Sequence, residues 1–303
     1  MPRLDFGPYS FETSNEDKVL FPEAGITKGQ LIDYYRNIAP VLLPHVEDRP
    51  LTLHRFPDGI RADGFYQHDT PDYFPDWIAR HEAPRAGDGK NGPVDHMLCN
   101  NEATLAYLAN QAAITLHAWL ATAPKLKHPD KLVFDLDPPG DDFEPVRQGA
   151  RWVVELMQEV GLSPFVMTTG SRGLHVVAPL KPDLDFDAVR DFARAMADWL
   201  AEQHPDELTV EQRKNKRRGR LYLDVMRNAY GQTSVAPYAV RALEGAPVAT
   251  PITLDELGDK HLAPRRWGLQ NIRRRLGQRD DPWRDFRRHA ASVRRAREKL
   301  ERL

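Results

Sequence analysis

Lys131-Leu-Val-Phe-Asp-Leu-Asp-Pro-Pro139 is a short apolar run that carries two carboxylates and ends in two prolines. Its alternation predicts a strand with apolar side chains on one face and Asp135 and Asp137 on the other. The two carboxylates would lie about 6–7 Å apart at the strand's end, a spacing that suits one or two hard divalent cations. Because Asp-x-Asp is a common sequence, the alternative at this point is a solvated pair without function.

The composition indicates a globular protein. The chain has 303 residues, of which 41% are hydrophobic and 28% charged, and it is long enough to bury a core. No apolar run comes near the roughly 18 residues of a membrane span, and the N-terminus Met1-Pro-Arg-Leu-Asp-Phe lacks the apolar h-region of a signal peptide. The single cysteine, Cys99, excludes internal disulfides and multi-cysteine zinc sites. We therefore expect a cytoplasmic, nucleoid-associated monomer with no membrane partner.

Charge is distributed unevenly along the chain. The net charge is −2, yet the segment 265–303 holds 14 Lys and Arg against 5 Asp and Glu. An acidic body with a basic, helical tail suggests contact with a polyanion. A solvated arginine-rich helix is the alternative that charge alone leaves open.

Periodicity and turn residues predict alternating strands and helices. Thr27 and Gln30 form a capping box that opens a helix, which Pro40 and Pro44 should kink or end. In a short strand at 64–68, we expect one of Phe65 and Tyr66 to be buried and the other exposed. Further strands are predicted at 51–56, 114–119, 131–137, 164–169 and 221–226, with a short one at 237–241, and helices at 102–112, 144–160 and 187–203.

Three separate features fit one chemistry. Strand 221–226 would present a third carboxylate, Asp224, which is costly inside a strand unless it is paired or bound to a metal. The turn Gly170-Ser-Arg-Gly-Leu-His175 offers a hydroxyl, an Arg, a His and backbone N–H groups that could approach a triphosphate. The run 213–220 carries six basic residues in eight. Together these groups predict metal-dependent nucleotidyl transfer. On its own, His117 would be interpreted as a structural histidine.

The motifs resemble those of a known family. Phe-Asp-Leu-Asp-Pro at 134–138, Thr-Gly-Ser-Arg-Gly-Leu-His-Val at 169–176 and Leu-Tyr-Leu-Asp-Val-Met-Arg-Asn at 221–228 resemble, in order and spacing, the three motifs of archaeo-eukaryotic primase-type polymerases. More closely, the chain resembles the polymerase domain of prokaryotic DNA ligase D, which works in non-homologous end joining. The likeness runs from Lys18 to about Leu276 and includes Gly-Phe-Tyr-Gln at 64–67 and Leu-His-Ala-Trp at 116–119.

The resemblance implies a role for each matching residue. Asp135, Asp137 and Asp224 would be catalytic and bind two Mn²⁺ or Mg²⁺ ions. The nucleoside triphosphate, NTP or dNTP, would be bound by Ser171, Arg172, Gly173, His175, His117, Gln232, Ser234, Arg241, Phe65 and Tyr66, the last two by stacking on a base. DNA would be contacted by Lys18, Lys28, His54, Arg55, Arg217 and Arg220, with the two lysines holding a 5′-phosphate.

We therefore expect an α/β (α+β) fold. A mostly antiparallel, RRM-like catalytic sheet packed with helices would be joined to an N-terminal α/β module. The chain would form a single primase-polymerase domain, with the N-terminal module at about 1–118, the catalytic module at about 119–260 and the basic tail at about 261–303. Its partners would be DNA with gaps or double-strand breaks and 5′-phosphate ends, a separate DNA ligase, and Ku.

The sequence departs from the family at a few points. The family often has Lys at the positions of His54 and His68, so fixed positive charge is missing there. Nothing resembles the ligase Lys-x-Asp-Gly motif or its nuclease module, so we expect a stand-alone polymerase or an excised domain. The predicted function is templated addition of nucleotides, favouring ribonucleotides, to a primer 3′-hydroxyl at DNA ends. The alternatives are a primase that starts chains on single-stranded DNA and a catalytically silent DNA-end binder.

Overall fold

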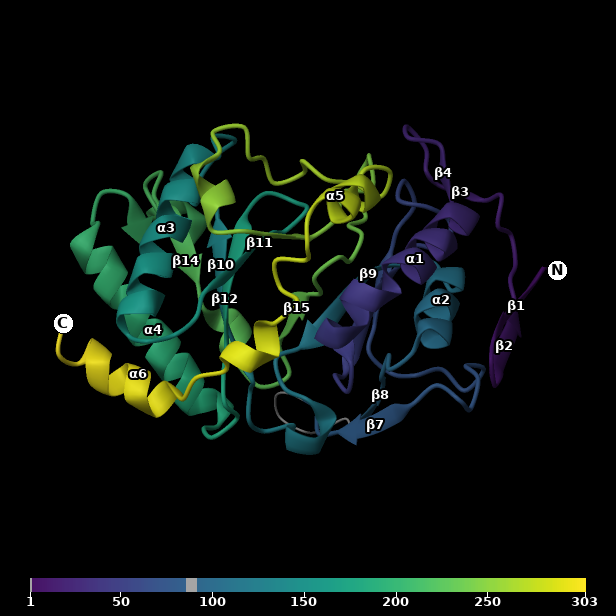
Figure 1. The fold of residues 1–303 in the computed structure, drawn as a ribbon, viewed down its shortest axis with the longest axis horizontal. Coiled ribbons are helices and arrows are strands. Elements are labelled where there is room, and N and C mark those ends of the chain that lie inside the picture. Colours follow the sequence, from purple (N-terminus) through teal and green to yellow (C-terminus); the bar gives the residue numbers. More distant parts are fainter. Residues whose placement is uncertain (1, 86–91) are drawn as a thin grey trace. The chain divides into compact units, whose positions relative to one another are not determined.

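The computed structural model describes residues 2–85 and 92–303, which form two compact units (Figure 1). Unit 1 comprises Met1–Pro124, Thr233–Ala249 and Trp267–Asp280; unit 2 comprises Lys125–Gln232, Thr250–Arg266 and Asp281–Leu303. The division of the chain near residues 118 and 260 stays a prediction. Within the described ranges, no helix is both long and apolar enough to cross a membrane.

Unit 2 is built on a six-stranded sheet in the order β13-β14-β10-β12-β11-β16. All neighbouring strands pair antiparallel except β13 and β14, which are parallel. This arrangement confirms the predicted mixed α/β fold with a mostly antiparallel sheet. The elements are β10 (Lys131–Asp137), α3 (Glu144–Glu159), β11 (Phe165–Thr168), β12 (Leu174–Pro179), α4 (Phe186–Gln203), β13 (Leu208–Thr209), β14 (Leu221–Asp224), β16 (Thr250–Ile252) and α6 (Val293–Leu300).

The helices α3 and α4 cover the apolar face of this sheet (Figure 1). Gly149 of α3 lies so close to Leu221 that an added Cβ would come within 2.2 Å of that leucine. In the strand register, Leu221 shares its face with Leu223, Leu136 and Phe134, which are all buried. The carboxylates of β10 therefore point to the opposite face, away from the two helices.

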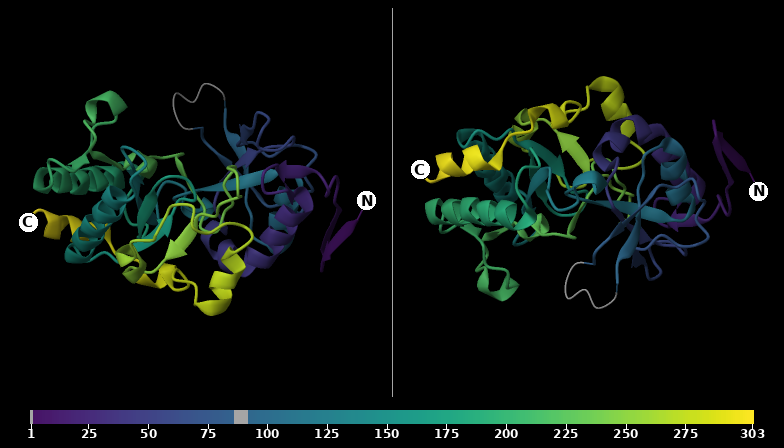
Figure 2. Two further views of the ribbon diagram at one scale, coloured as in Figure 1. Left: turned by 90° about the horizontal axis from the view of Figure 1, so that it is seen from above. Right: turned by 90° about the horizontal axis from the view of Figure 1, so that it is seen from below.

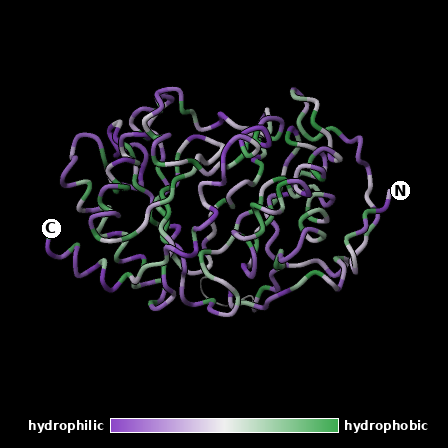
Figure 3. Tube along the Cα trace, viewed as in Figure 1, coloured by the Kyte–Doolittle hydropathy of each residue, from purple (hydrophilic) through white to green (hydrophobic). Residues whose placement is uncertain are grey.

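The basic tail contributes to the core of unit 2. Trp283 is 2% exposed and its indole N–H donates to the Val166 carbonyl of β11 at 3.1 Å. Phe286 stacks on Trp283, and Val293 and Ala296 of α6 are buried. Hydrophobic residues gather along the central strands, whereas the segment before the C-terminus is mostly hydrophilic (Figure 3). The tail thus has an apolar side that docks and a charged side that remains in solvent.

In its described residues, unit 1 contains a four-stranded sheet in the order β15-β9-β5-β6, together with smaller hairpins and three α-helices. All pairings in this sheet are antiparallel. The elements are β1 (Arg3–Phe6), β2 (Tyr9–Glu12), β3 (Val19–Phe21), β4 (Ile26–Thr27), α1 (Lys28–Val46), β5 (Leu51–Arg55), β6 (Phe65–Gln67), β7 (Arg80–Ala83), β8 (Val94–Met97), α2 (Glu102–Asn110), β9 (Ala113–Trp119), β15 (Thr233–Val235) and α5 (Ile272–Gln278).

Helix α1 begins as predicted and runs further than its prolines suggest. The reciprocal capping box between Thr27 and Gln30 is present. Pro40 and Pro44 lie inside the helix, which continues to Val46, so an end at either proline is wrong. Both prolines are on the exposed side, where the packing of the buried stripe is not disturbed. That burial outweighs the backbone hydrogen bonds which proline removes.

Three smaller expectations are wrong. Phe65 and Tyr66 are both exposed, at 46% and 57%, because β6 is an edge strand and neither ring is covered by a further layer. Strand β14 ends at Asp224, since the Met226 N–H donates to the Asp224 carboxylate and a 3₁₀ turn follows. The segment 237–241 forms only an isolated bridge between Val240 and Val248.

Candidate active site

The three acids of the sequence motifs lie on one face of two neighbouring strands. Asp135 of β10 is directly opposite Asp224 of β14, and Asp137 is opposite Tyr222. Directly opposed residues of an antiparallel pair point to the same side, and so do alternate residues of one strand. All three carboxylates therefore project from the sheet face that α3 and α4 leave uncovered.

Asp135 is held in its charged form by its neighbours His175 and Arg227. His175 Nε2 lies 3.4 Å from one carboxylate oxygen and Arg227 Nε 3.5 Å from the other. Burial alone would raise the pKa of Asp135, but His175 and Arg227 outweigh it and lower that pKa below its ordinary value. His175 is positioned by strand pairing, since it faces Asp135 across β10 and β12.

Asp137 and Asp224 have the opposite electrostatics. Burial, followed by repulsion from Asp135 and Asp224, raises the pKa of Asp137. Burial is also the largest cause of the raised pKa of Asp224, where the Met226 N–H works against it and Asp135 adds to it. The raised values show that negative charge on this face is only partly compensated by the protein. A bound cation would relieve that repulsion.

The turn before β12 is fixed by Thr169. Its hydroxyl accepts hydrogen bonds from the N–H groups of Ser171 and Gly173, at 3.3 and 3.2 Å. These two backbone donors are therefore already engaged within the turn, and the approach of the turn's N–H groups to a triphosphate stays a prediction. Gly173 has a different reason to be glycine, because a Cβ there would lie 2.1 Å from the Leu136 carbonyl oxygen.

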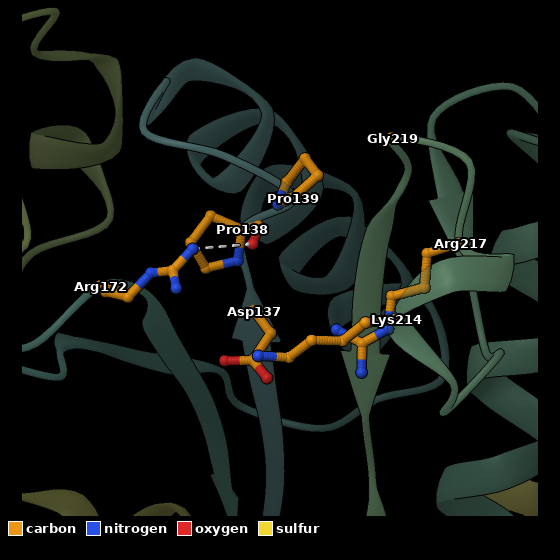
Figure 4. Close-up of a pocket in the computed structure, with 7 residues that line it drawn as sticks. All are labelled: Asp137, Pro138, Pro139, Arg172, Lys214, Arg217 and Gly219. Carbon is orange, nitrogen blue, oxygen red and sulfur yellow. Dashed lines mark hydrogen bonds between the residues drawn. The ribbon is translucent and has the colours of Figure 1, made fainter.

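Basic side chains surround a cavity of about 210 Å³ beside Asp137 (Figure 4). Arg172 lines one side, where it donates to the Pro138 carbonyl at 3.4 Å, and Lys214 and Arg217 line the other. Arg217 is 9% exposed and is anchored by the Glu211 and Gln212 carbonyls and by the Tyr222 ring, 3.9 Å from its guanidinium. The cavity combines one carboxylate with three cations, which suits phosphate groups.

The basic segment around Lys214 stands out from unit 2, and most of its residues are exposed (Figure 2). Arg220, at its end, donates to the carbonyls of Arg217 and Pro205. Arg217 and Arg220 thus differ, because only Arg217 lines the cavity beside Asp137. Gln232 follows a turn at Gly231, and its side chain is exposed.

Arg227 and Asn228 carried no predicted role. Arg227 pairs with Asp135, and Asn228, which is fully buried, bonds to both the N–H and the carbonyl of Val133 at 2.9 and 2.8 Å. The amide of Asn228 thereby ties β10 to the turn after β14 and fixes the two acids relative to each other. In the sequence, Arg227 and Asn228 closely follow the strand that ends in Asp224, and this position could have identified them as candidates.

Unit 1 presents its own group of candidate residues on one face of β5, β6 and β9. The His54 and Tyr66 rings stack with centroids 4.1 Å apart, and His117 meets Tyr66 edge-on at 6.0 Å. Burial first, and then the charge of Arg241, lower the pKa of His54. The imidazole of His54 is therefore neutral at pH 7, and the exposed Tyr66 ring offers one open face for stacking.

Phe65, Arg55 and Ser234 lie on the other face of this sheet, by strand alternation. Arg55 is 8% exposed and is held by Gln67, Tyr73 and Gln111, with its guanidinium over the Phe65 ring. It is placed to orient the Phe65 ring more than to reach a phosphate. The structure therefore does not bring Phe65 and Tyr66 onto one surface.

Lys18 and Lys28 lie together although nine residues separate them in the sequence. The β3–β4 hairpin joins them, and the Lys28 N–H donates to the Lys18 carbonyl at 2.8 Å. Burial, and next the charge of Lys18, lower the pKa of Lys28, whose ammonium donates to Ser14 and to the Asn110 carbonyl. Lys18 forms an ion pair with Asp58 at 2.6 Å. Two adjacent ammonium groups are suited to an anion.

The acids fit a hard divalent cation by their donor chemistry. All three offer carboxylate oxygens, which Mg²⁺ and Mn²⁺ prefer. In the described part of the chain, no three His, Cys, Asp or Glu side chains converge on one point as ligands of a closed metal site. Mg²⁺ is usually held by one or two carboxylates with substrate phosphates completing its shell. Paired acids beside a cationic cavity fit that mode.

The chain is similar to known proteins. The family described as "LigD, primase-polymerase domain" matches residues 27–283. The chain is 32% identical over 268 residues to a multifunctional non-homologous end joining protein LigD of Mycolicibacterium smegmatis, covering 86% of this chain and 35% of that protein. It is 30% identical over 290 residues to a bifunctional one of Bacillus subtilis, covering 95% and 45%. The chain thus spans less than half the length of these relatives.

A solved structure is also similar. The polymerase domain of Mycobacterium tuberculosis ligase D in complex with DNA superposes with a TM-score of 0.86 at 29% identity. The match covers 92% of this chain and 99% of that domain.

Proposed function

The chain belongs to the LigD primase-polymerase domain family of nucleotidyltransferases, and from this premise we propose that it extends a primer 3′-hydroxyl at DNA ends, gaps and breaks. The reaction would be template-directed and dependent on divalent metal. The observation that carries the proposal is the direct opposition of Asp135 and Asp224, with Asp137 on the same face.

Each acid would contribute in its own way. Asp135, kept ionised by His175 and Arg227, offers a permanent anionic ligand. Asp137 and Asp224, whose pKa values are raised, would gain most from a cation beside them. When bound, divalent cations would lower the pKa of the primer 3′-hydroxyl and neutralise charge on the triphosphate.

The basic residues of unit 2 would hold the phosphates. Arg172, Lys214 and Arg217 face the cavity beside Asp137, where their charges would orient a triphosphate and stabilise negative charge as it develops. In unit 1, Tyr66 would stack on a base, and Lys18 with Lys28 would bind the 5′-phosphate at a gap or break. The proposed nucleotide is a ribonucleotide, the proposed metal is Mn²⁺ or Mg²⁺, and the proposed partners are a separate ligase and Ku.

The setting proposed for this activity is the cytoplasm, on chromosomal DNA. Cys99 is free and buried, and burial raises the pKa of its thiol to about 12, so it behaves as an inert packing residue. End joining as the biological role is supported by the names of the relatives, which are non-homologous end joining proteins.

Substitution of Asp137 tests the proposed activity. Asp137→Ala should abolish primer extension on a gapped duplex with Mn²⁺ or Mg²⁺ and leave binding of that duplex largely intact. Asp141→Ala is the matched control, because Asp141 is an exposed carboxylate a few residues beyond the strand. Undiminished synthesis by Asp137→Ala would overturn the assignment of the acids. Comparing rNTP with dNTP, and gaps with and without a 5′-phosphate, tests the finer proposals.

A further inference from the structure

A second cationic cavity, of about 630 Å³, lies in unit 2 away from the three acids. It is lined by the end of α3 at Val160 and Gly161, by Lys181 after β12, and by the tail from Ala290 through α6. Lys131 and Pro179 pair at this end of the sheet, whereas Asp137 ends β10 at the other. The separation along β10 is roughly 20 Å at ~3.3 Å per residue.

The cavity is shaped by specific contacts between the tail and the sheet. Ala291 forms a parallel bridge with Leu180, and the Lys181 N–H donates to the Ala291 carbonyl at 2.9 Å. Ser292 donates to the Asp183 carboxylate at 2.7 Å, and Arg297 donates to the Ala188 carbonyl of α4 at 2.8 Å. These contacts fix the tail segment to the rest of unit 2.

Three cations line this cavity against one carboxylate. Lys181, Arg295 and Lys299 are exposed, and no carboxylate of the described ranges forms an ion pair with any of them. The single acid, Asp183, is engaged by Ser292. Arg295 and Lys299 are four residues apart, so they share one face of α6. Their mutual repulsion would be relieved by an anion.

We propose that this cavity binds phosphate groups, and that its natural ligand is the backbone of a DNA duplex arm extending from the site of synthesis. The choice of DNA rests on the proposed function. A cationic pocket at a distance from the acids can bind the backbone without reading sequence. It also gives the basic tail a function beyond packing. The alternative is a purely structural role for Lys299, in which its ammonium, near Gly161, stabilises the C-terminal end of α3.

The test compares two double variants of the tail. Arg295→Ala/Lys299→Ala removes two cavity charges, and Arg288→Ala/Arg302→Ala removes two exposed charges of the same tail outside the cavity. Binding is measured over a salt series on gapped duplexes with long and short arms. Roughly six base pairs span 20 Å, so arms of about 12 base pairs reach the cavity and arms of about 4 do not.

We expect the cavity variant to bind the long-armed duplex about 10-fold more weakly than the control, with a salt slope reduced by about 1–2. Binding and extension of the short-armed duplex should equal those of the wild type. Lys181 lines the same cavity but does not belong to α6. Lys181→Ala should therefore weaken binding of the long-armed duplex as well, and it provides the test if the substitutions in α6 unfold the protein. Melting temperatures establish that each variant is folded.

Inorganic tripolyphosphate separates the two sources of phosphate. If it stabilises the wild type but not the cavity variant, while both bind long-armed DNA equally, the ligand is a free polyphosphate and the phosphate site stands. Equal behaviour of the cavity and control variants in both assays would overturn the proposal. A cavity variant that melts at a lower temperature but binds DNA and tripolyphosphate like the wild type would also overturn it. Extension of short-armed DNA is measured separately. A failure of the proposed polymerase activity can therefore be distinguished from a failure of the proposed phosphate site.

Discussion

Asp135 and Asp224 face each other across β10 and β14, one held ionised by its neighbours and the other with a raised pKa. The pair therefore combines a fixed negative charge with a carboxylate whose ionisation is opposed by burial and by that charge. Such an arrangement favours binding a cation over stabilising the fold.

Asp224→Asn tests whether Asp224 serves cation binding at the expense of stability. The amide cannot ionise but can still accept the Met226 N–H, so repulsion from Asp135 disappears while the local turn is kept. We expect primer extension to fall by about 100-fold or more and the melting temperature without metal to rise. Single-nucleotide extension and thermal unfolding measure the two effects. A variant that is both active and less stable would contradict the interpretation.

Gly173→Ala should strongly destabilise unit 2. Its Cβ would collide with the Leu136 carbonyl oxygen, which belongs to the strand bearing both acids. Relieving that contact requires a backbone shift, at a cost of about 1–3 kcal/mol or more. The control is Gly140→Ala, since no atom lies within 4 Å of a Cβ there. Chemical denaturation of both variants measures the difference, and equal stability would refute the close approach.

Tyr66→Ala should weaken nucleotide or template binding. The exposed ring stacked on His54 offers base stacking worth about 1–3 kcal/mol, or roughly 5- to 150-fold in KM for the nucleotide or in template affinity. Tyr66→Phe keeps the aromatic face and should remain close to the wild type. Steady-state extension on a gapped template distinguishes them. A similar loss in both variants would assign the effect to the hydroxyl instead of the ring.

The wild-type protein should lose stability at acidic pH because of three histidines in unit 1. Burial is the largest cause of the lowered pKa of His54, His68 and His96. Below about pH 6.5, the ordinary pKa of histidine, the unfolded chain binds protons more readily than the folded one. The free energy of unfolding therefore decreases as the pH is lowered. The wild type should melt at a lower temperature at pH 5.5 than at pH 7.5.

His54→Gln should shrink that difference without abolishing it, because His68 and His96 remain. Melting temperatures at the two pH values, compared between the variant and the wild type, give the readout. An unchanged difference would mean that His54 is not titrating differently in the folded state.

The sequence was most informative where local rules act alone. The alternation and prolines of 131–139 gave β10, and the Thr27–Gln30 capping box gave the start of α1. Apolar periodicity located α3 and α4 to within a residue or two. These features depend on short-range backbone and side-chain preferences, which a sequence displays directly.

What the sequence could not supply depends on long-range pairing. The roles of Arg227 and Asn228 arise only when β14 lies beside β10. The exposure of both Phe65 and Tyr66 follows from the edge position of β6, and the occupation of two N–H groups by Thr169 follows from how the turn closes. None of these has a periodic or compositional signal.

The interleaving of the two units has a consequence for synthesis on the ribosome. Strand β9 emerges early, but β15, which pairs with one of its edges, belongs to Thr233–Ala249, behind most of unit 2. Unit 1 is complete only once its last segment, Trp267–Asp280, has been made. A nascent chain therefore carries an open β9 edge while the six-stranded sheet of unit 2 is being translated. For the same reason, no single uninterrupted fragment of the chain contains the whole of unit 1 without much of unit 2.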